Sequence, residues 1–283
     1  MGDVLAGIHA TWEFSHDSVL IRFERGIRTP KLFQALRERR VPHEALASVT
    51  LTPGKRGTVV LHAVPRPGAD PLMEAAAGQL KESGDPYRLV LPADHETLAE
   101  YYADELRAVL TTDAPPAGHY LVDPPPAPLS FKAYDAKASF DGFTASFRWF
   151  WTGASSAKWK AGDQHFAVSE LSGVEWRSPE VLDGYLRLLR RGADHQPAQA
   201  DHDPAAVVFG LGYGPVHESL PFAAAVLAAI RKSEPADAVP VAAGRRDPAD
   251  IAERIRHLGE LHEAGLVTDE EFTAKKAELL AEL

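Results

Sequence analysis

The sequence contains no cysteine, which excludes disulfide bonds and thiolate metal sites. It also lacks any run of about 18 or more apolar residues, the length that a membrane-spanning helix needs. The residues after Met1 show no basic start followed by an apolar core, so we expect no secretory signal. Together these absences predict a cytoplasmic protein.

Basic residues are fewer than acidic ones, and the formal net charge is −10. Residues 247–283 contain ten acidic and four basic residues, so most of the excess negative charge lies there. A chain with this balance repels nucleic acid unless it has a concentrated basic patch. We therefore expect no nucleic-acid partner.

What the sequence does have is 45% apolar and 25% charged residues, as in an ordinary globular protein. Two proline-rich stretches, Thr111 to Ser130 and Ser233 to Asp247, divide it. The sequence thus predicts a first domain at 1–111, a linker at 112–132 and a second domain at 133–232. A tether at 233–246 and a short C-terminal region at 247–283 follow.

The two long segments match each other in order, which indicates an internal duplication. VPHEALASVTL, from Val41, aligns with FAVSELSGVEW, from Phe166. GTVVLHAV, from Gly57, aligns with GYLRLLRR, from Gly184, and YRLVL aligns with AVVFGL. Each copy then ends in a segment with helical periodicity, 96–110 or 218–230. The first of these has the apolar stripe Leu98, Tyr101, Tyr102, Leu106 and Leu110, whereas the second is apolar nearly all round.

Several short antiparallel strands followed by one helix are typical of an α+β fold. This order resembles pleckstrin-homology-like (PH-like) domains. The fold class expected is therefore α+β: two tandem PH-like split β-barrels, each closed by a C-terminal helix, plus a C-terminal two-helix hairpin.

The C-terminal region has the pattern of two short amphipathic helices. Asp247 and Pro248 suit a helix start, Gly265 suits a helix end, and Thr268 with Glu271 forms a capping box. The apolar positions are Ile251, Ile255, Leu258, Leu261, Phe272, Leu279, Leu280 and Leu283. About 37 residues cannot bury such faces alone, so we expect the hairpin to need a partner surface.

This pattern resembles the bacterial short C-terminal domain (SHOCT) family, and the resemblance implies oligomerisation or anchoring. The duplicated region is similar to an actinobacterial family of tandem PH-like repeats, which implies no particular activity.

None of the candidate chemical motifs in the sequence is convincing. The glycine-rich FGLGYGPVH, from Phe209, closes a repeat instead of opening a βαβ unit, so we interpret it as a tight turn and not a phosphate loop. Ser155 and Lys158 have the Ser-x-x-Lys spacing, but they are expected in a loop and lack the accompanying elements of penicillin-recognising enzymes. Loop residues that offer metal ligands, without a rigid frame, are Asp194, His195, Asp201, His202 and Asp203. We therefore expect no enzyme, no cofactor and no metal.

Two surface features are candidates for binding. Cations gather around the first long loop and are candidates for binding an anion or a lipid headgroup: Arg22, Arg25, Arg28, Lys31, Arg37, Arg39 and Arg40. Interleaved glutamates weaken their field, so a solvated loop of mixed charge is the interpretation that the sequence favours: Glu13, Glu24, Glu38 and Glu44. In the segment from Phe147 to Lys160, alternation predicts that Phe147, Trp149 and Trp151 face the core. Phe150 and Trp159 are then candidates for an interface.

The function expected from these features is that of a non-enzymatic scaffold. Its hairpin would form a homo-oligomer or recruit a protein partner, so that several weak sites act together. One alternative is a peripheral protein of the inner membrane face, which binds anionic lipid through the basic loop of the first domain. Another is a hydrolase, for which the sequence offers no cleft with convergent polar groups.

Overall fold

The computed structural model describes residues 3–111, 114–192, 197 and 199–233. In the first repeat, alternating buried and exposed side chains build two sheets, as in β3, where Val19, Ile21 and Phe23 are buried and Arg22 is exposed. Four strands form one antiparallel sheet in chain order: β1 (Asp3–Ala6), β2 (Ala10–Phe14), β3 (Ser18–Phe23) and β4 (Glu38–Pro42). Three strands form the other: β5 (Leu46–Pro53), β6 (Thr58–Pro65) and β7 (Arg88–Pro92). The α-helices of this repeat are α1 (Lys31–Leu36), α2 (Pro71–Ala76) and α3 (Glu96–Val109).

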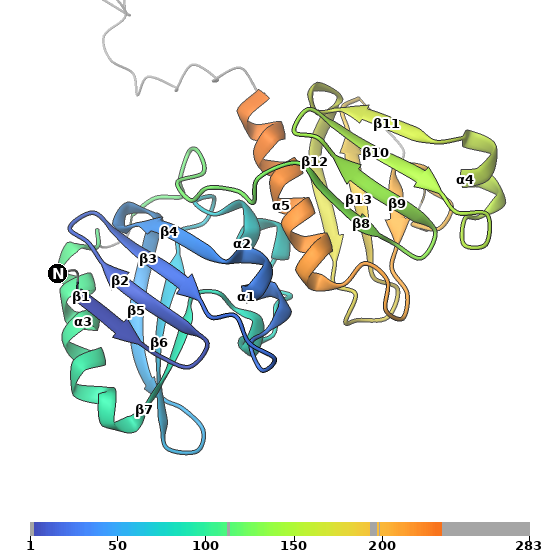
Figure 1. Cartoon of the computed structure of the whole chain (residues 1–283). Helices are drawn as coiled ribbons and strands as arrows, with labels where there is room; N and C mark the ends of the chain where they lie inside the picture. Colours follow the sequence, from blue (N-terminus) through green and yellow to red (C-terminus); the bar gives the residue numbers. More distant parts are fainter. Residues whose placement is uncertain (1–2, 112–113, 193–196, 198, 234–283) are drawn as a thin grey trace, which may run out of the picture. The chain divides into compact units, whose positions relative to one another are not determined.

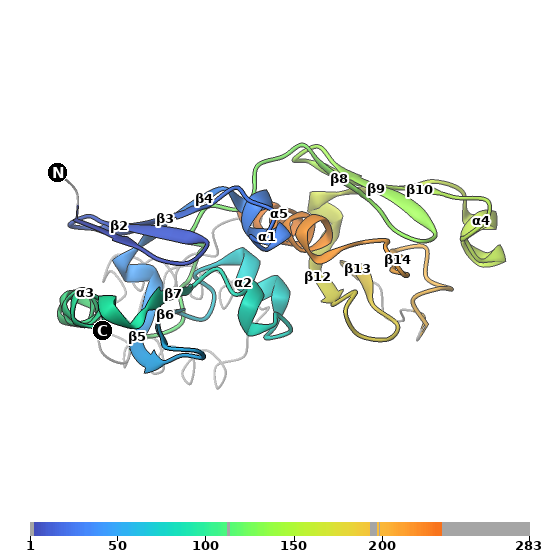
Figure 2. The same ribbon diagram turned by 60° about the horizontal axis from the view of Figure 1, so that its bottom comes forward.

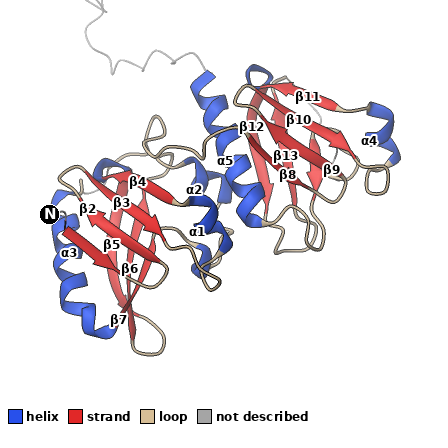
Figure 3. Ribbon diagram, viewed as in Figure 1, coloured by secondary structure: helices blue, strands red, loops and turns tan. Residues whose placement is uncertain are grey.

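The second repeat has the same order of sheets (Figures 1 and 3). Its four-stranded sheet contains β8 (Leu129–Lys132), β9 (Ala136–Phe140), β10 (Thr144–Trp149) and β11 (Gln164–Ala167). Its three-stranded sheet contains β12 (Leu171–Arg177), β13 (Tyr185–Arg190) and β14 (Ala206–Val208). Its helices are α4 (Ser156–Ala161) and α5 (Val216–Ser233). Figure 2 shows that the two sheets of each repeat lie in two layers.

The strand register confirms the duplication. Both copies have a bulge at the start of their three-stranded sheet, after Leu46 in the first and after Leu171 in the second. Val19 pairs with Val41 in the first copy, as Ala145 pairs with Phe166 in the second.

The register also corrects the sequence alignment of the later strands. Leu61 pairs with Leu51 in the first copy, and Leu186 pairs with Trp176 in the second. Leu61 of β6 therefore corresponds to Leu186 of β13, two residues before the position that the sequence alignment gives. Leu89 pairs with Leu61, and Val207 pairs with Leu186. Leu89 of β7 therefore corresponds to Val207 of β14, one residue before the position that the sequence alignment gives. The loop before β13 is longer than the loop before β6, and aligning its glycine with Gly57 therefore gave the wrong register.

The architecture is mixed α and β, as expected, but the strands do not close into one barrel. Within the described residues each repeat has two separate antiparallel sheets. Short 3-10 helices, His43–Ala45 and Val168–Glu170, connect the sheets at equivalent positions in the two repeats. The hairpin expected over residues 247–283 lies outside the described residues.

Helix α3 covers the three-stranded sheet of the first repeat with a narrower face than the sequence predicts. Tyr102 and Leu106 are buried, but Leu98 and Tyr101 are 44% and 55% exposed. Two alanines, Ala99 and Ala103, complete the buried face instead. Small side chains allow the helix to approach the sheet closely. The predicted stripe contained only large apolar residues and therefore omitted these alanines.

Helix α5 joins the two repeats. It packs against β12 and β8 of its own repeat and against α1 and α2 of the first (Figure 1). Its apolar surface is therefore buried on more than one side, as the sequence predicts. Leu32, Leu72, Ala75 and Ala76 of the first repeat belong to the hydrophobic core of the second. Residues 1–233 accordingly form one compact unit.

A cleft between the two repeats as the candidate functional site

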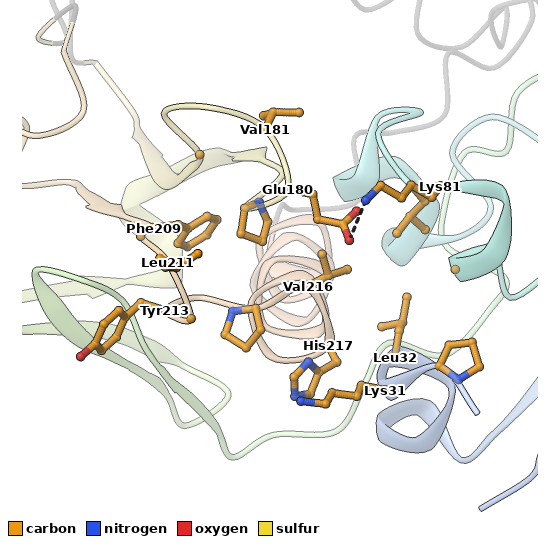
Figure 4. A pocket seen from close by; sticks show the side chains of 18 of the residues that line it. Lys31, Leu32, Lys81, Glu180, Val181, Phe209, Leu211, Tyr213, Val216 and His217 are labelled. Atoms are coloured by element: carbon orange, nitrogen blue, oxygen red, sulfur yellow. Dashed lines mark ion pairs between the residues drawn. The ribbon is translucent and has the colours of Figure 1, made fainter. Parts of the chain in front are cut away.

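A cleft of about 780 Å³ lies between the repeats, beside the start of α5 (Figure 4). Two segments of the first repeat contribute to it, the start of α1 and the segment between α2 and β7. The loop between β12 and β13 and the loop between β14 and α5 supply the opposite side. The site therefore depends on the contact between the two repeats, which α5 makes with α1 and α2, and α2 makes with β12.

The cleft combines a half-buried apolar floor with an exposed apolar rim. Leu80, Phe209 and Val216 are partly buried and pack against the shared core, which includes the lining residue Leu32. The rim carries side chains that are far more exposed than is usual for their type: Val181 at 48%, Leu182 at 82%, Leu211 at 103% and Tyr213 at 43%. Exposed apolar side chains clustered around a hollow are characteristic of interaction sites.

The glycine-rich turn from Phe209 holds part of this rim in place. The amide of Tyr213 donates to the carbonyl of Gly210 at 2.9 Å, and the amide of Gly214 donates to the carbonyl of Lys132 at 2.7 Å. Gly214 has a φ of +65°, and a Cβ there would overlap the ring of Phe209. The segment is thus a tight turn, as the sequence predicts, and it presents Leu211 to solvent.

The charged groups of the cleft are few and mixed in sign. Lys81 Nζ lies 3.2 Å from Glu180 Oε1, an ion pair that links the two repeats (Figure 4). Burial lowers the pKa of His217, the positive charge of Lys31 lowers it further, and Glu218 opposes the shift. A neutral imidazole beside an exposed lysine leaves the α1 side of the cleft weakly positive. The exposed ammonium of Lys31 suits the recognition of a carboxylate on this side of the cleft.

The structure disperses the seven cations of the predicted anion site. Arg39 is not an exposed cation: its side chain is 4% exposed, and its Nη2 donates to Asp70 Oδ1 at 2.8 Å. Arg39 occupies an inward-facing position of β4, which a simple count of basic residues does not show. Arg22 is paired with Glu13 and Glu38. Arg22, Arg39 and Arg40 line a separate cavity of about 520 Å³, whereas Lys31 lines the cleft. The remaining three, Arg25, Arg28 and Arg37, are exposed.

The aromatic segment differs from the prediction at one residue. Phe147 and Trp149 are buried, as expected, but Trp151 is 78% exposed because β10 ends at Trp149 and a turn follows. Trp151 contacts Trp159 edge to face, with ring centroids 5.2 Å apart. Trp159 is 49% exposed, and Phe150 is half-buried. The sequence therefore missed Trp151 as a surface aromatic; the glycine two residues later was the signal for the turn.

Ser155 and Lys158 lie at the start of a helix and not in a loop. Ser155 is the N-cap of α4, and its hydroxyl donates to the carbonyl of Asp201 at 2.6 Å. The ammonium of Lys158 is buried and lies 2.5 Å from Asp135 Oδ2. The Ser-x-x-Lys spacing thus serves to cap a helix and to place a buried ion pair.

The loop that offered metal ligands is only partly described. Asp194 and His195 lie outside the described residues. Asp203 is buried, and its Oδ2 lies 3.0 Å from Arg187 Nε. Among the described residues no group of three potential ligands comes together. The apolar positions of the expected hairpin, from Ile251 to Leu283, also lie outside the described part.

No helix among the described residues has the length and apolar character needed to cross a membrane.

A comparison with curated proteins gave no match. Residues 253–280 match the Short C-terminal domain, which confirms the resemblance of the C-terminal region. Residues 12–107 and 138–227 each match a domain of unknown function (DUF4429), so that this domain occurs twice in tandem and covers more than half of the chain. The chain therefore belongs to the DUF4429 family, with a Short C-terminal domain after the second copy.

Proposed function

We propose that this protein is a non-enzymatic scaffold that binds a segment of a partner protein in the cleft between its repeats. The observation that carries the proposal is the exposed apolar rim, above all Leu182 and Leu211. Leaving such side chains in water costs about 1.5–3 kcal/mol each relative to burying them. A partner that covers them would recover this free energy.

The shape and charge of the cleft favour an extended peptide with apolar side chains and a carboxylate. The rim residues come from two loops on the same side of the cleft, so that successive side chains of a peptide would meet Leu182 and Leu211. Lys31, on the opposite side, is exposed and would attract the carboxylate. Peptide sites of this kind use a few apolar contacts for affinity and a charge for orientation.

We also propose that each repeat is PH-like. A four-stranded sheet, a three-stranded sheet and a following helix occur in that order in both copies. In this view the cleft is a product of the duplication, because one copy alone supplies only one of its sides.

The Short C-terminal domain would supply multivalency. If it gathers several chains, each with one weak cleft, the assembly binds a repeated or clustered partner far more tightly than one chain does. The resulting activity is that of a scaffold, in which the body recognises and the C-terminal region assembles.

A displayed library of random peptides, selected on the full chain, tests the cleft. Selected peptides should bind Leu211→Asp and Leu182→Asp at least about tenfold more weakly, since each change removes one buried leucine contact. Leu98→Asp is the matched control, because Leu98 is an exposed leucine of α3 outside the cleft. Equal weakening by Leu98→Asp, or no weakening by the two rim changes, would contradict the proposal.

Light scattering after gel filtration tests the assembly. The full chain should have the mass of an oligomer, and a chain that ends at Arg246 should have the mass of a monomer. Identical monomer masses would show that the C-terminal domain does not gather copies, and the scaffold would then reduce to a single binding cleft.

A further inference from the structure

Three cations lie next to one another across the second repeat. Lys132 of β8 is the cross-strand partner of Lys137 in β9, and Lys137 is the partner of Arg148 in β10. All three side chains are exposed, while their neighbours along the strands face the core. We call these three residues the basic row. Like charges directly opposite each other destabilise a sheet, so the row is unfavourable for the fold by itself.

No ion pair within the described part of the chain neutralises the basic row. None of its three cations has an ion-pair partner among the described residues. Asp163, just before β11, continues the register of β10 and β11 and lies opposite Arg148. Its Oδ1 accepts a hydrogen bond from the amide of Trp149 at 3.1 Å. The carboxylate is thus used to hold the end of β10. With the charge of Asp163 counted, the row keeps a net charge of +2 (three cations and one carboxylate).

The first repeat shows that the fold does not require this row. Its equivalent cross-strand positions are Ala6, Thr11 and Arg22. The single cation among them, Arg22, is paired with Glu13 and Glu38. The same sheet is therefore built with one neutralised charge in the first copy and with three free charges in the second.

Exposed aromatic residues lie at the same end of the second repeat. Arg148 is the second-last residue of β10, and the turn that follows carries Trp151. Figures 1 and 2 both show α4, which carries Trp159 and Lys160, at this end of β10. Trp151 and Trp159 form their edge-to-face pair there while 78% and 49% exposed. The first repeat has Arg25 and Gln34 at the corresponding positions.

We propose that this end of the second repeat is a docking surface for an anionic membrane. Lysine and arginine near anionic headgroups each strengthen binding about fivefold, and tryptophan favours the boundary between headgroups and acyl chains. The basic row would lie against the headgroups while the tryptophan pair enters the boundary. This surface belongs to the second repeat and is separate from the basic loop of the first.

A membrane fits these residues better than nucleic acid does. The electrostatic part of nucleic-acid binding grows with the number of phosphates that are neutralised, and the row with Lys160 supplies only four cations. The tryptophan pair also adds apolar area, which the headgroup boundary accommodates.

Sedimentation of the full chain with vesicles tests the proposal. The chain should bind vesicles of phosphatidylcholine with phosphatidylserine, should bind phosphatidylcholine alone far more weakly, and should be released by high salt. The triple variant Lys132→Glu, Lys137→Glu and Arg148→Glu should bind at least about 100-fold more weakly. Trp151→Ala with Trp159→Ala should weaken binding while leaving its salt dependence in place.

The matched control makes the same change of charge in the first repeat: Arg25→Glu, Arg28→Glu and Arg37→Glu. This variant should keep most of the binding, because these cations lie outside the proposed surface. Because all six positions are exposed, both triple variants should keep the circular dichroism of the parent chain. The proposal is wrong if the parent chain does not bind anionic vesicles, if the control variant loses as much binding as the row variant, or if a single-stranded oligonucleotide competes with vesicles for the row.

Discussion

The ammonium of Lys158 lies 2.5 Å from the carboxylate of Asp135, and both side chains are at most 1% exposed. The pair joins α4 to the turn between β8 and β9, and the other oxygen of Asp135 accepts the amide of Val208 at 3.0 Å. Burial raises the pKa of Asp135 and lowers the pKa of Lys158, while the mutual attraction of the two groups opposes both shifts. The stability of this corner of the second repeat therefore depends on both partners.

Replacing one partner of this pair should be costly. Asp135→Asn keeps an acceptor for Val208 but leaves a buried ammonium without its counter-charge, and it should lower the free energy of unfolding by about 3–5 kcal/mol. Lys158→Met should have a cost of the same order, because it leaves the buried carboxylate of Asp135 without a positively charged partner. The double variant should lose clearly less than the two costs added together, as urea denaturation can measure. Additive losses would show that the two groups do not depend on each other.

Consecutive residues of α1 face different cores: Leu32 belongs to the core of the second repeat and Phe33 to that of the first. We therefore predict that the two repeats unfold together. Leu61→Ala, a fully buried change inside the first repeat, should lower the free energy of unfolding by about 2–5 kcal/mol. Hydrogen exchange should show the same loss in β13 of the second repeat as in β6. Unchanged protection of β13 would mean that the repeats open independently.

Two glycines of the turn from Phe209 provide a matched pair of substitutions. Gly212 has a φ of +79° with open space around it, so Gly212→Ala should cost about 1–2 kcal/mol from backbone strain alone. Gly214→Ala adds an overlap with the ring of Phe209, and its cost should exceed that of Gly212→Ala by about 1–3 kcal/mol. Thermal unfolding of both variants measures the difference. Equal costs would show that the ring moves aside freely.

His217 should make the protein less stable in mild acid. Its pKa is lower in the folded protein than the ordinary value of about 6.5, so the unfolded chain binds the proton first as the pH falls. The contribution is therefore fully present above about pH 6.5 and is lost as the pH falls below that value. His217→Gln should remove part of the stability difference between about pH 7 and pH 5, as urea denaturation at both values can measure. Burial lowers the pKa of His43 as well, and His43→Gln gives an independent comparison. A larger pH dependence in His217→Gln than in the parent chain would contradict the prediction.

Much of the candidate cleft could not be predicted from the sequence. Leu182 and Leu211 are isolated leucines in loops, and their exposure follows from the turns that carry them. The cleft brings together Lys31, Lys81, Glu180 and His217, which lie in four separate segments. These segments meet because α5 packs against α1 and α2, α2 contacts β12, and Gln79 exchanges hydrogen bonds with the backbone of Trp176 and Ser178.

The sequence by itself determined the duplication, the helix that ends each copy, the apolar character of α5 and the Short C-terminal domain. These properties follow from local periodicity and capping, which each segment carries alone. The tertiary structure decided the register of β6 and β13, the burial of Arg39 and the exposure of Trp151. It also decided the alignment of Lys132, Lys137 and Arg148 on neighbouring strands. These properties depend on hydrogen bonds and packing between segments far apart in the chain, and a shift of one residue in register moves a side chain to the opposite face of its sheet.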